Sequence, residues 1–565
     1  MGLSAVRASL RRAGLAGINA DECRESVVLN GTVPTWQDFV AAGYAAAGKG
    51  YRGVVNDVQV EGVDPQSLPV PALSDDVLEG RDFDAVIIGG GIIGCLLARE
   101  LRRFDITVAL LEKEADVGRG VSSRNNGILH PSLAAAPGTR KAAYGTRGNR
   151  MYRKLASELG FRLDWSGALY LFPRRWYAAL YPLAYRRARR NGEEHMGLLG
   201  RADVFHLEPH AWPAQQGGIL FPDSGVVAPD QVTIAGADNA VENGARIFLN
   251  TAVTGLDVER GRVTAIRTNR GRLRGRVVIN AAGVWADRVA ELADDRFYTI
   301  HPRKGVMAVT DRTLGDFQQR SLGMMWIRGS GHTKGGGVSR TVEGNLLLGP
   351  TADEVPGRED YGTSGEELEA VLRRHMPLND WLRPDHIIAY FAGVRAATFE
   401  EDFVVEQSRH LTNLIHVAGI QSPGLTAAPA IAEDVRDLVA AVLRREIPVR
   451  PRPEFDPCRK PPPSLSRLTL EERHRLILRD SAYGRIVCRC EEVSEGEVVA
   501  AIHSPLPATT VSAVKHRVRT GMGRCQGGFC TPSLLKLIAR ETATAAAQVT
   551  WEGDGSPMLA GDTGE

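Results

Sequence analysis

The sequence is poor in cysteine, in aromatic residues and in net charge, and it has no long apolar run. Cysteine accounts for 7 of 565 residues, 6% are aromatic and the formal net charge is +2. This charge balance gives no reason to expect nucleic acid or another polyanion as a partner. No segment approaches the roughly 18 apolar residues that a membrane-spanning helix needs. Residues 1–17 also lack the apolar stretch typical of a signal peptide. We therefore expect a cytoplasmic protein in which cysteines are metal ligands or inert.

Two proline-containing segments divide the chain. A length of 565 residues suggests about two to four domains. The segments at 64–82 and 447–466 read as linkers, because proline-rich stretches do not belong to a packed core. The predicted units are an N-terminal module at 1–63, a large α/β unit at 83–446, a cysteine-bearing unit at 467–540 and a glycine-rich tail at 541–565.

The N-terminal module is predicted as strand, helix and strand. An apolar strand pattern precedes the helix-opening residues TWQDF, and GVVNDVQVEG closes the unit with alternating apolar positions. This order over residues 26–62 resembles the BON module, a small βαβ fold often found near membranes. A generic small α/β appendage is the alternative, and either interpretation leaves the function of the module open.

A dinucleotide fingerprint begins the large unit. The apolar strand AVII runs directly into Gly89-x-Gly91-x-x-Gly94, a helical apolar pattern follows, and a second strand ends in Glu112. Gly89 allows the tight turn, Gly91 lets backbone amides approach a pyrophosphate, and Gly94 lets helix and strand pack closely. Glu112 can accept hydrogen bonds from ribose hydroxyls. The motif alone does not decide between FAD and NAD.

Two further segments favour FAD. One apolar strand runs into the turn at Gly283, and another is followed by a loop that opens a helix at Gly424, Leu425 and Thr426. This pattern resembles the glycine-oxidase and D-amino-acid-oxidase superfamily. The resemblance implies an α/β fold in which a Rossmann-type FAD-binding domain is interleaved with an antiparallel-sheet substrate domain. It also implies that the last helix directs its positive end at the flavin.

The loop after Glu112 resembles a narrower branch, the FAD-dependent glycerol-3-phosphate dehydrogenases and oxidases, including the type 2 forms and the large catalytic component of the anaerobic enzyme. The resemblance lies in the segment SSRNNGILH and in residues 137–152, which include Lys141. It implies that six consecutive residues line the flavin: Ser122, Ser123, Arg124, Asn125, Asn126 and Gly127. It places His130 near the flavin ring as the base, and a group titrating near pH 7 suits removal of a hydroxyl proton.

The same resemblance implies an anion clamp. Arg395, in the segment that begins with Gly393, would bind a carboxylate or phosphate, for which a planar guanidinium is suited. Lys304 and Ser422 would face the same substrate. The family often continues Gly-x-Arg with proline, whereas this chain has Ala396, so the shape of that loop is open.

Four cysteines gather near the end of the chain. Cys488-x-Cys490 and Cys525-x4-Cys530 are separated by 34 residues, which departs from the paired Cys-x-x-Cys typical of zinc. The pattern resembles the bacterioferritin-associated-ferredoxin-like domain and implies a [2Fe–2S] cluster. Zinc and an empty or redox-active dithiol site are the alternatives. We expect the basic residues 515–519 to offset the thiolate charge, and nearby glycines to free amides for the cluster.

Together these patterns predict an FAD- and [2Fe–2S]-containing dehydrogenase that oxidises sn-glycerol 3-phosphate to dihydroxyacetone phosphate. Electrons would pass through the cluster to a partner subunit or a quinone pathway, and that partner could bring the protein to the membrane. One alternative uses the same machinery on L-2-hydroxyglutarate or an amino or imino acid. Another, of a different class, is an electron-transfer or iron-release adaptor that oxidises no substrate. Whether FAD is covalently bound is left open.

Overall fold

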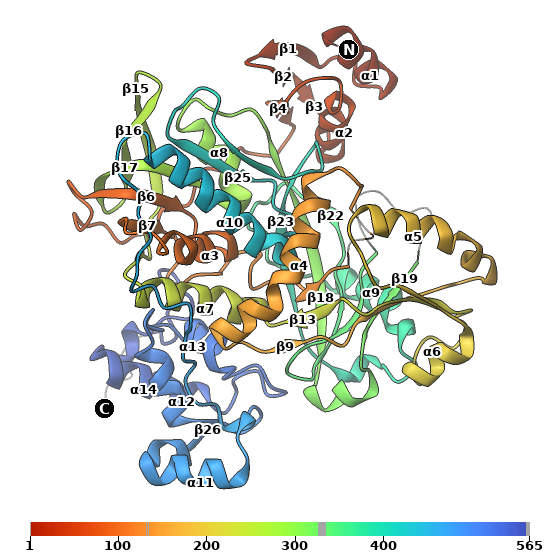
Figure 1. Ribbon diagram of the computed structural model, residues 1–565, viewed down its shortest axis with the longest axis vertical. Helices are drawn as coiled ribbons and strands as arrows, with labels where there is room; N and C mark the ends of the chain where they lie inside the picture. The colour runs from red at the N-terminus through yellow and green to blue at the C-terminus, as the bar shows by residue number, and fades with distance from the viewer. Residues whose placement is uncertain (1, 132, 134, 326–334, 561–565) are drawn as a thin grey trace.

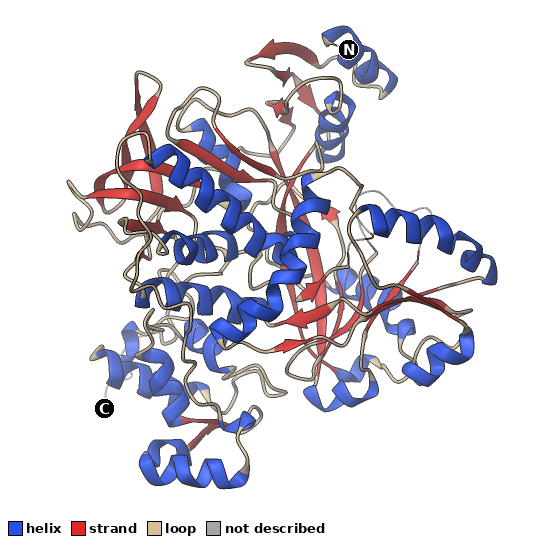
Figure 2. Ribbon diagram, viewed as in Figure 1, coloured by secondary structure: helices blue, strands red, loops and turns tan. Residues whose placement is uncertain are grey.

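The computed structural model describes residues 2–131, 133, 135–325 and 335–560. The N-terminal module lies at one end of the molecule and the cysteine-bearing unit at the other, with the large unit between them (Figure 1). Helices cover the sheets of the large unit, and the chain crosses between its two main sheets several times (Figure 2). No helix in the described part of the chain is long and apolar enough to cross a membrane.

The first main sheet of the large unit carries the dinucleotide fingerprint. Its strands run in the order β14-β7-β6-β17-β16-β15, with β25 on β17 and β24 on β25. The bounds are β6 Asp82–Ile88, β7 Val108–Leu111, β14 Arg246–Phe248, β15 Val253–Glu259, β16 Arg262–Thr268, β17 Gly271–Asn280, β24 Val404–Gln407 and β25 Leu414–Ala418. Strands β14, β7, β6, β17 and β25 are parallel neighbours. Because helices cover both faces of such a sheet, its strands read as unbroken apolar runs.

Helices pack on both faces of this sheet. They are α3 Ile92–Leu101, α4 Arg140–Leu159, α7 Pro229–Glu242, α8 Ala286–Glu291 and α10 Gly424–Leu443. Helix α3 packs against α7 and α10, and α10 packs against α4, whereas α8 lies against β17 and β25. Helix α4 begins at Thr139, which accepts a hydrogen bond from the amide of Ala142, and ends at Gly160 with φ of 68°. These helices and the parallel strands share the largest apolar core.

The second main sheet forms the other half of the large unit. In the described residues its order is β11-β12-β10-β19-β20-β21-β18-β22, with β23 also paired to β18. The bounds are β10 Ala168–Leu171, β11 Gly197–Leu199, β12 Gly218–Phe221, β18 Ile300–Thr310, β19 Ser321–Met324, β20 Gly337–Arg340, β21 Leu346–Gly349, β22 Asp353–Glu354 and β23 Ile387–Thr398. Its helices are α5 Tyr181–Arg190, α6 Arg201–Leu207 and α9 Gly365–His375.

Two features of the large unit bring its halves together. Strands β18 and β23 pair antiparallel along almost their whole length, with Arg303 opposite Arg395. A short sheet of β8 Ile128–Leu129, β13 Gly225–Val227 and β9 Leu163–Asp164 fixes the loop that follows the fingerprint. The interleaving of a Rossmann-type sheet with a mostly antiparallel sheet agrees with the fold class predicted from the sequence.

The N-terminal module contains more than the predicted strand, helix and strand. Its elements are α1 Leu3–Arg12, β1 Asn19–Cys23, β2 Ser26–Asn30, β3 Thr32–Val33, α2 Trp36–Ala46, β4 Val54–Asn56 and β5 Gln59–Val60. Strands β2 and β4 are parallel and α2 connects them, while α1 and β1 complete the module. Its likeness to BON remains a prediction. Phe399 of the large unit is 2% exposed and belongs to the apolar core of this module.

The cysteine-bearing unit is a small helical assembly. Its elements are α11 Leu470–Arg479, β26 Ile486–Cys488, β27 Val493–Ser494, α12 Glu495–Ile502, α13 Val511–Val518 and α14 Thr531–Thr542. Ser494 and Glu497 cap the start of α12 reciprocally, which fixes the helix directly after the first cysteine loop. The unit docks on the large unit through an ion pair between Arg517 and Asp116, whose side chains are both almost completely buried.

Candidate active site and cluster site

The fingerprint turn is as tight as its glycines predict. A Cβ on Gly94 would lie 2.0 Å from the carbonyl oxygen of Gly89, and a Cβ on Gly89 would lie 2.5 Å from that of Ala281. Gly89 also has φ of 109°, which side chains rarely adopt. The glycines leave this turn without side chains of its own, and the backbone at the start of α3 fits the diphosphate of a dinucleotide.

Glu112 ends β7 beside this turn. Its Oε2 accepts the amide hydrogen of Gly90 at 2.6 Å, and its Oε1 accepts that of Glu114 at 2.9 Å. Burial raises the pKa of Glu112 to about 7. Next to it, Ser122 Oγ accepts the amide hydrogen of Ile92 at 2.9 Å, at the first turn of α3. The acid and the turn are in contact, which fits a ribose hydroxyl partner for Glu112.

A cavity of about 610 Å³ opens from the fingerprint towards the second sheet. Its wall includes these predicted site residues: Gly91, Ser122, Arg124, Asn125, Asn126, His130, Gly283, Arg395, Ser422, Gly424 and Leu425. The remaining predicted residues of the large unit lie outside its lining: Gly89, Gly94, Glu112, Ser123, Gly127, Lys304, Gly393 and Thr426. Several of these support the wall instead, because a Cβ on Gly393 would lie 2.1 Å from the carbonyl oxygen of Arg124 and one on Gly127 would lie 2.2 Å from that of Val227.

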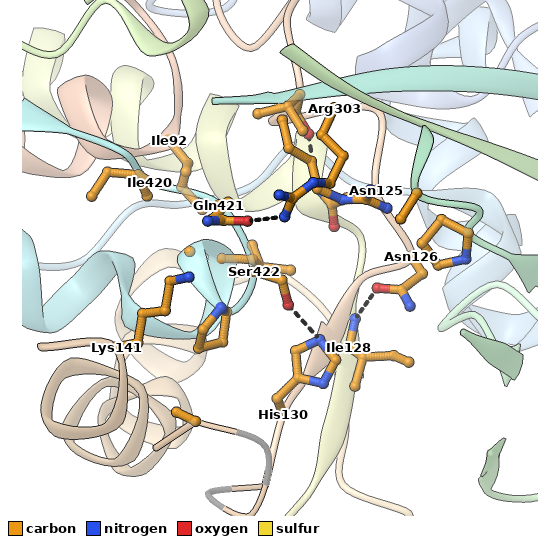
Figure 3. A pocket seen from close by; sticks show the side chains of 18 of the residues that line it. Ile92, Asn125, Asn126, Ile128, His130, Lys141, Arg303, Ile420, Gln421 and Ser422 are labelled. Carbon is orange, nitrogen blue, oxygen red and sulfur yellow. Dashed lines mark hydrogen bonds between the residues drawn. The ribbon is translucent and has the colours of Figure 1, made fainter. Parts of the chain in front are cut away.

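His130 and Ser422 meet at the cavity wall. His130 follows β8, and Ser422 lies in the loop before α10; their side chains point towards each other (Figure 3). His130 Nε2 is 3.4 Å from Ser422 Oγ. The backbone amide of His130 donates to Thr426 Oγ1 at 3.0 Å, so the first turn of α10 fixes the strand that presents the imidazole. A neutral imidazole with a hydroxyl partner can accept a proton from an alcohol.

Arg395 brings a positive charge to the cavity. Its side chain is partly exposed there, and its guanidinium donates to the carbonyl oxygen of Thr351 at 3.0 Å. Among the described residues no carboxylate forms an ion pair with it. Burial lowers the pKa of Arg395 to about 10, and the charge of Arg303 adds to this effect. Gly305 leaves the space for this side chain, since a Cβ there would lie 2.4 Å from the guanidinium.

The structure does not bring Lys304 to the cavity. Its ammonium lies 3.1 Å from Asp360 and 2.9 Å from Glu367 of α9, on the opposite face of the sheet. Its neighbour Arg303 lines the cavity instead. Successive residues of a strand point to opposite faces, so Arg303 takes the place at the cavity that was predicted for Lys304.

Arg303 is a hub of hydrogen bonds behind the wall and is only 2% exposed. Its Nε donates to Glu354 at 2.7 Å, NH1 to Gln421 at 2.9 Å and NH2 to Glu401 at 2.6 Å. A further hydrogen bond from NH2 reaches Tyr44 in the N-terminal module at 2.7 Å. Figure 3 shows Arg303 and Gln421 facing each other across the upper part of the cavity. Arg303 therefore holds the loop that carries Ser422.

Two acids follow β23 at the same wall. The Lys141 ammonium lies 3.2 Å from Glu401 Oε2. Burial alone would raise the pKa of Glu401, but the hydrogen bond and charge of Arg303 outweigh it and lower the pKa to about 2. Burial raises the pKa of the adjacent Glu400 to about 7. The cavity therefore contains one firmly ionised carboxylate and one that titrates near neutral pH.

Sequence reasoning assigned no role to several of these residues. The sequence did not show that Arg303 lies on the cavity face of β18. Glu400 and Glu401 lie in the segment FEEDF, which matched no motif. The paired acids shortly after Gly-x-Arg were the available signal. Nothing in the sequence connects Tyr44 with Arg303, because 258 residues separate them.

The four cysteines come together as two pairs. Cys490 Sγ and Cys525 Sγ are 3.6 Å apart and partly exposed, whereas Cys488 and Cys530 are hydrogen-bonded to each other and buried. That hydrogen bond lowers the pKa of Cys488 to about 6. In the described part of the chain, no three His, Cys, Asp or Glu side chains are grouped so that they could hold one metal ion. Two pairs of thiols suit a cluster with two irons better than a single zinc ion.

Backbone amides point at these thiols from glycine-bearing turns. Cys488 accepts from the amide of Gly521, and Cys525 accepts from those of Phe529 and Gly527, which lowers the pKa of Cys525. Gly521 and Gly527 have φ of 79° and 91°. Amide donors around thiolates are the environment that an iron–sulfur cluster needs, so the residues present fit the group.

The basic residues of α13 have a different role from the one expected. Arg517 pairs with Asp116 at 2.7 Å, and His516 Nδ1 lies 2.9 Å from Asp230 of α7. Arg519 does remain near the cluster site, where it contacts Glu491 at 2.8 Å. This stretch therefore fastens the cysteine-bearing unit to the large unit more than it balances thiolate charge.

Comparison with known proteins agrees with both sites. Residues 84–438 match the family model "FAD dependent oxidoreductase", and residues 486–540 match "BFD-like [2Fe-2S] binding domain". A glycerol 3-phosphate dehydrogenase of Caloramator mitchellensis is 36% identical over 489 residues, covering 85% of this chain and 99% of that protein. One subunit of the anaerobic glycerol-3-phosphate dehydrogenase of Escherichia coli K12 is 27% identical, covering 83% of this chain and 90% of that relative.

Solved structures share the fold of the large unit. The L-alpha-glycerophosphate oxidase of Mycoplasma pneumoniae, solved with FAD bound, superposes with a TM-score of 0.62 at 24% identity, over 68% of this chain and 99% of that one. Glycine oxidase of Bacillus cereus gives a TM-score of 0.56 at 20% identity, over 64% and 95% of the two chains. The predicted fold class is thereby confirmed.

The cofactors named by the two family models, FAD and a [2Fe–2S] cluster, are those that the two family resemblances predicted, and the prediction is confirmed. The zinc and dithiol alternatives are not favoured. The chain belongs to the FAD dependent oxidoreductase family and carries a BFD-like [2Fe–2S] binding domain.

Proposed function

We propose that this protein oxidises sn-glycerol 3-phosphate to dihydroxyacetone phosphate and passes the electrons to a partner subunit. The observation that carries this proposal is Arg395, a guanidinium on the cavity wall with no ion-paired carboxylate among the described residues, in the same cavity as His130. A positive charge kept without a counter-ion is suited to an anionic substrate. The 36% identical relative named as a glycerol 3-phosphate dehydrogenase supports the choice of phosphate.

Four residues of the cavity have a task in this proposal. Arg395 and Lys141, whose side chains are partly exposed, bind the phosphate. Ser422, 3.4 Å from His130 Nε2, orients the secondary hydroxyl, and His130 Nε2 takes its proton. When bound, FAD would supply a hydride acceptor beside the carbinol carbon, and the cluster would supply a one-electron acceptor. Loss of one hydride and one proton converts the alcohol into the ketone.

The cluster site offers a place for the electron acceptor. Cys490 and Cys525 are partly exposed, and the side chain of Phe529 is 78% exposed beside them. Because electrons pass between closely spaced centres, we infer that a partner docks over this face. Two relatives are named as subunits of anaerobic dehydrogenases, which supports a partner subunit rather than direct reduction of oxygen.

An anaerobic titration of the holoprotein tests the substrate. Glycerol 3-phosphate, L-2-hydroxyglutarate and L-proline are added separately, and flavin absorbance is followed. We expect bleaching with glycerol 3-phosphate at the lowest concentration. Bleaching only with 2-hydroxyglutarate or proline would replace the proposal with a carboxylate substrate. No bleaching with any of the three would leave the adaptor hypothesis as the better one.

A further inference from the structure

The N-terminal module reaches the wall of the substrate cavity through one helix. Neither family model matches residues 1–83. Helix α2 of the module nevertheless places the hydroxyl of Tyr44 behind the cavity, where it donates to Glu401 Oε1 at 2.6 Å and accepts from Arg303 NH2 at 2.7 Å. Glu401 and Arg303 both line the cavity. A residue outside the oxidoreductase unit thus completes a hydrogen-bonded triangle with two residues inside it.

A second contact from the module holds Glu400, the acid next to Glu401. The amide of Val54 in β4 donates to Glu400 Oε1 at 2.8 Å. Glu401 adopts φ of 56°, a conformation that a residue with a side chain holds only when its surroundings fix it. The module therefore supplies one donor to each acid of the pair and holds this turn from behind.

The module and the large unit pack too closely to move independently at this point. Phe399 of the large unit lies in the module's core, and Tyr44 contacts its ring edge-on with centroids 5.5 Å apart. A Cβ on Gly43 would lie 2.3 Å from that same ring. Arg52 pairs with Glu406 at 2.5 Å with its side chain 8% exposed, which adds a buried ion pair to the interface.

The triangle is connected to the catalytic loop. Arg303 NH1 donates to Gln421 Oε1 at 2.9 Å, and Gln421 Nε2 donates to Glu401 Oε2 at 2.7 Å. Gln421 is the residue before Ser422. Glu401 Oε2 is also the atom that lies 3.2 Å from the Lys141 ammonium. The position of Glu401 therefore decides how much of the Lys141 charge is left for a substrate.

We propose that residues 1–63 form a fixed wall of the substrate site and that Tyr44 is a positioning residue, which holds the Glu401 carboxylate against Arg303. This inference rests on the proposed function for the identity of the substrate, but not for its anionic class. Without the Tyr44 hydroxyl, Glu401 loses one of its donors, and its carboxylate binds Lys141, with which it already pairs at 3.2 Å, more tightly. The carboxylate then competes with the phosphate group for that cation.

Tyr44→Phe in the full-length holoprotein tests the proposal, because the ring that packs on Phe399 is retained. Inorganic phosphate serves as the probe, and its midpoint concentration is read from the rise in Tm, which requires no turnover. We expect the midpoint for phosphate and the KM for glycerol 3-phosphate to rise about tenfold, the effect of one hydrogen bond to a charged group. The kcat should change less than about twofold, because His130 and Ser422 stay in place.

Two variants separate positioning from general stability. Tyr51→Phe removes a hydroxyl of the same module that bonds Glu22 on the exposed side, and neither readout should change. Arg52→Met breaks the buried ion pair with Glu406, so it should lower Tm yet leave the phosphate midpoint within about twofold. If Tyr44→Phe keeps less than half of the wild-type flavin, Tyr44→His decides, because it restores a donor. Recovery of the wild-type phosphate midpoint in Tyr44→His supports the proposal, and no recovery of that midpoint overturns it.

The outcomes also distinguish the proposed role of Tyr44 from the proposed function of the protein. A phosphate midpoint in Tyr44→Phe within about twofold of wild type overturns the role of Tyr44, whatever the substrate is. A wild-type flavin that glycerol 3-phosphate does not reduce overturns the proposed function. In that case the phosphate midpoint still decides whether the N-terminal module shapes an anion site.

Discussion

The cluster site and the substrate cavity gather their residues over different lengths of chain. The four cysteines lie within 488–530, on two loops of one small unit, and their mutual positions follow from local turns. The cavity draws on residues from Gly91 to Leu425 and is supported by Tyr44 from a separate module. Ligands set by local spacing can be recognised as a motif, whereas a wall assembled by tertiary packing depends on every element that supports it.

The largest effect should come from removing one local ligand. We expect Cys490→Ser to lose the cluster, with iron content falling below about half of wild type, because an incomplete thiolate set does not retain two irons. Electron transfer to an external acceptor should fall more than about 100-fold, while anaerobic flavin reduction by the substrate stays within about twofold, since the cavity lies in another unit. Iron analysis and stopped-flow absorbance measure the two quantities.

Cys458→Ser is the matched control, because this free and exposed cysteine lies in the linker between the units. It should retain iron and turnover. If Cys490→Ser slowed flavin reduction as much as acceptor reduction, the two sites would not be separable in the way that the comparison implies.

The next effect concerns His130, the proposed base. We expect His130→Asn to slow flavin reduction about 100- to 10,000-fold with FAD content unchanged, since general base catalysis contributes that much and asparagine cannot take the proton. Stopped-flow reduction under anaerobic conditions checks this. His474→Asn, at an exposed position of α11, should reduce flavin at the wild-type rate. A normal rate in His130→Asn would show that another group accepts the proton.

The two faces of the β18–β23 pair give a sharper test of the cavity. Arg395→Met should raise the KM for glycerol 3-phosphate about 100-fold, because a phosphate loses a charge-assisted partner worth about 2–3 kcal/mol. Lys304→Met should raise it less than about threefold, since that ammonium faces Asp360 and Glu367. Steady-state kinetics of both variants decide the point. Equal losses would place Lys304 in the site after all.

The smallest effect is a pH dependence. Glu400 has a pKa raised to about 7, so it is neutral below this pH and adds a negative charge to the cavity above it. The Kd for sulfate, which does not titrate in this range, should therefore rise about fivefold between about pH 6 and 8. In Glu400→Gln the rise should shrink. Identical pH profiles in the two proteins would contradict the ionisation of Glu400.

The fingerprint and the cysteine pattern were predictable because each is fixed by a few adjacent residues. Gly89, Gly91 and Gly94 must be glycines for the turn to close, so the sequence carries their geometry directly. Glu112 likewise follows from the length of one strand–helix–strand unit. The [2Fe–2S] site followed from the resemblance of the cysteine pattern to a known domain, without knowledge of how the unit docks.

Which residues of a strand face the cavity was not predictable in the same way. Residues 303 and 304 are both basic, so the sequence pattern around them fits either face, and a shift by one residue exchanges cavity for helix α9. The partners of residues 515–519 were equally hidden, because Asp116 and Asp230 reach α13 only after the units dock. Tyr44 shows the same limit over a much longer separation in the chain.

The insertion of Phe399 into the core of the N-terminal module has a consequence for biosynthesis. The module leaves the ribosome before residue 399, so its core is incomplete until that residue has been made. At ~5–20 residues per second, the intervening chain takes on the order of 20 to 70 seconds to synthesise. During translation the module therefore exposes apolar surface for that period, and it reaches its native packing only after most of the large unit has been made.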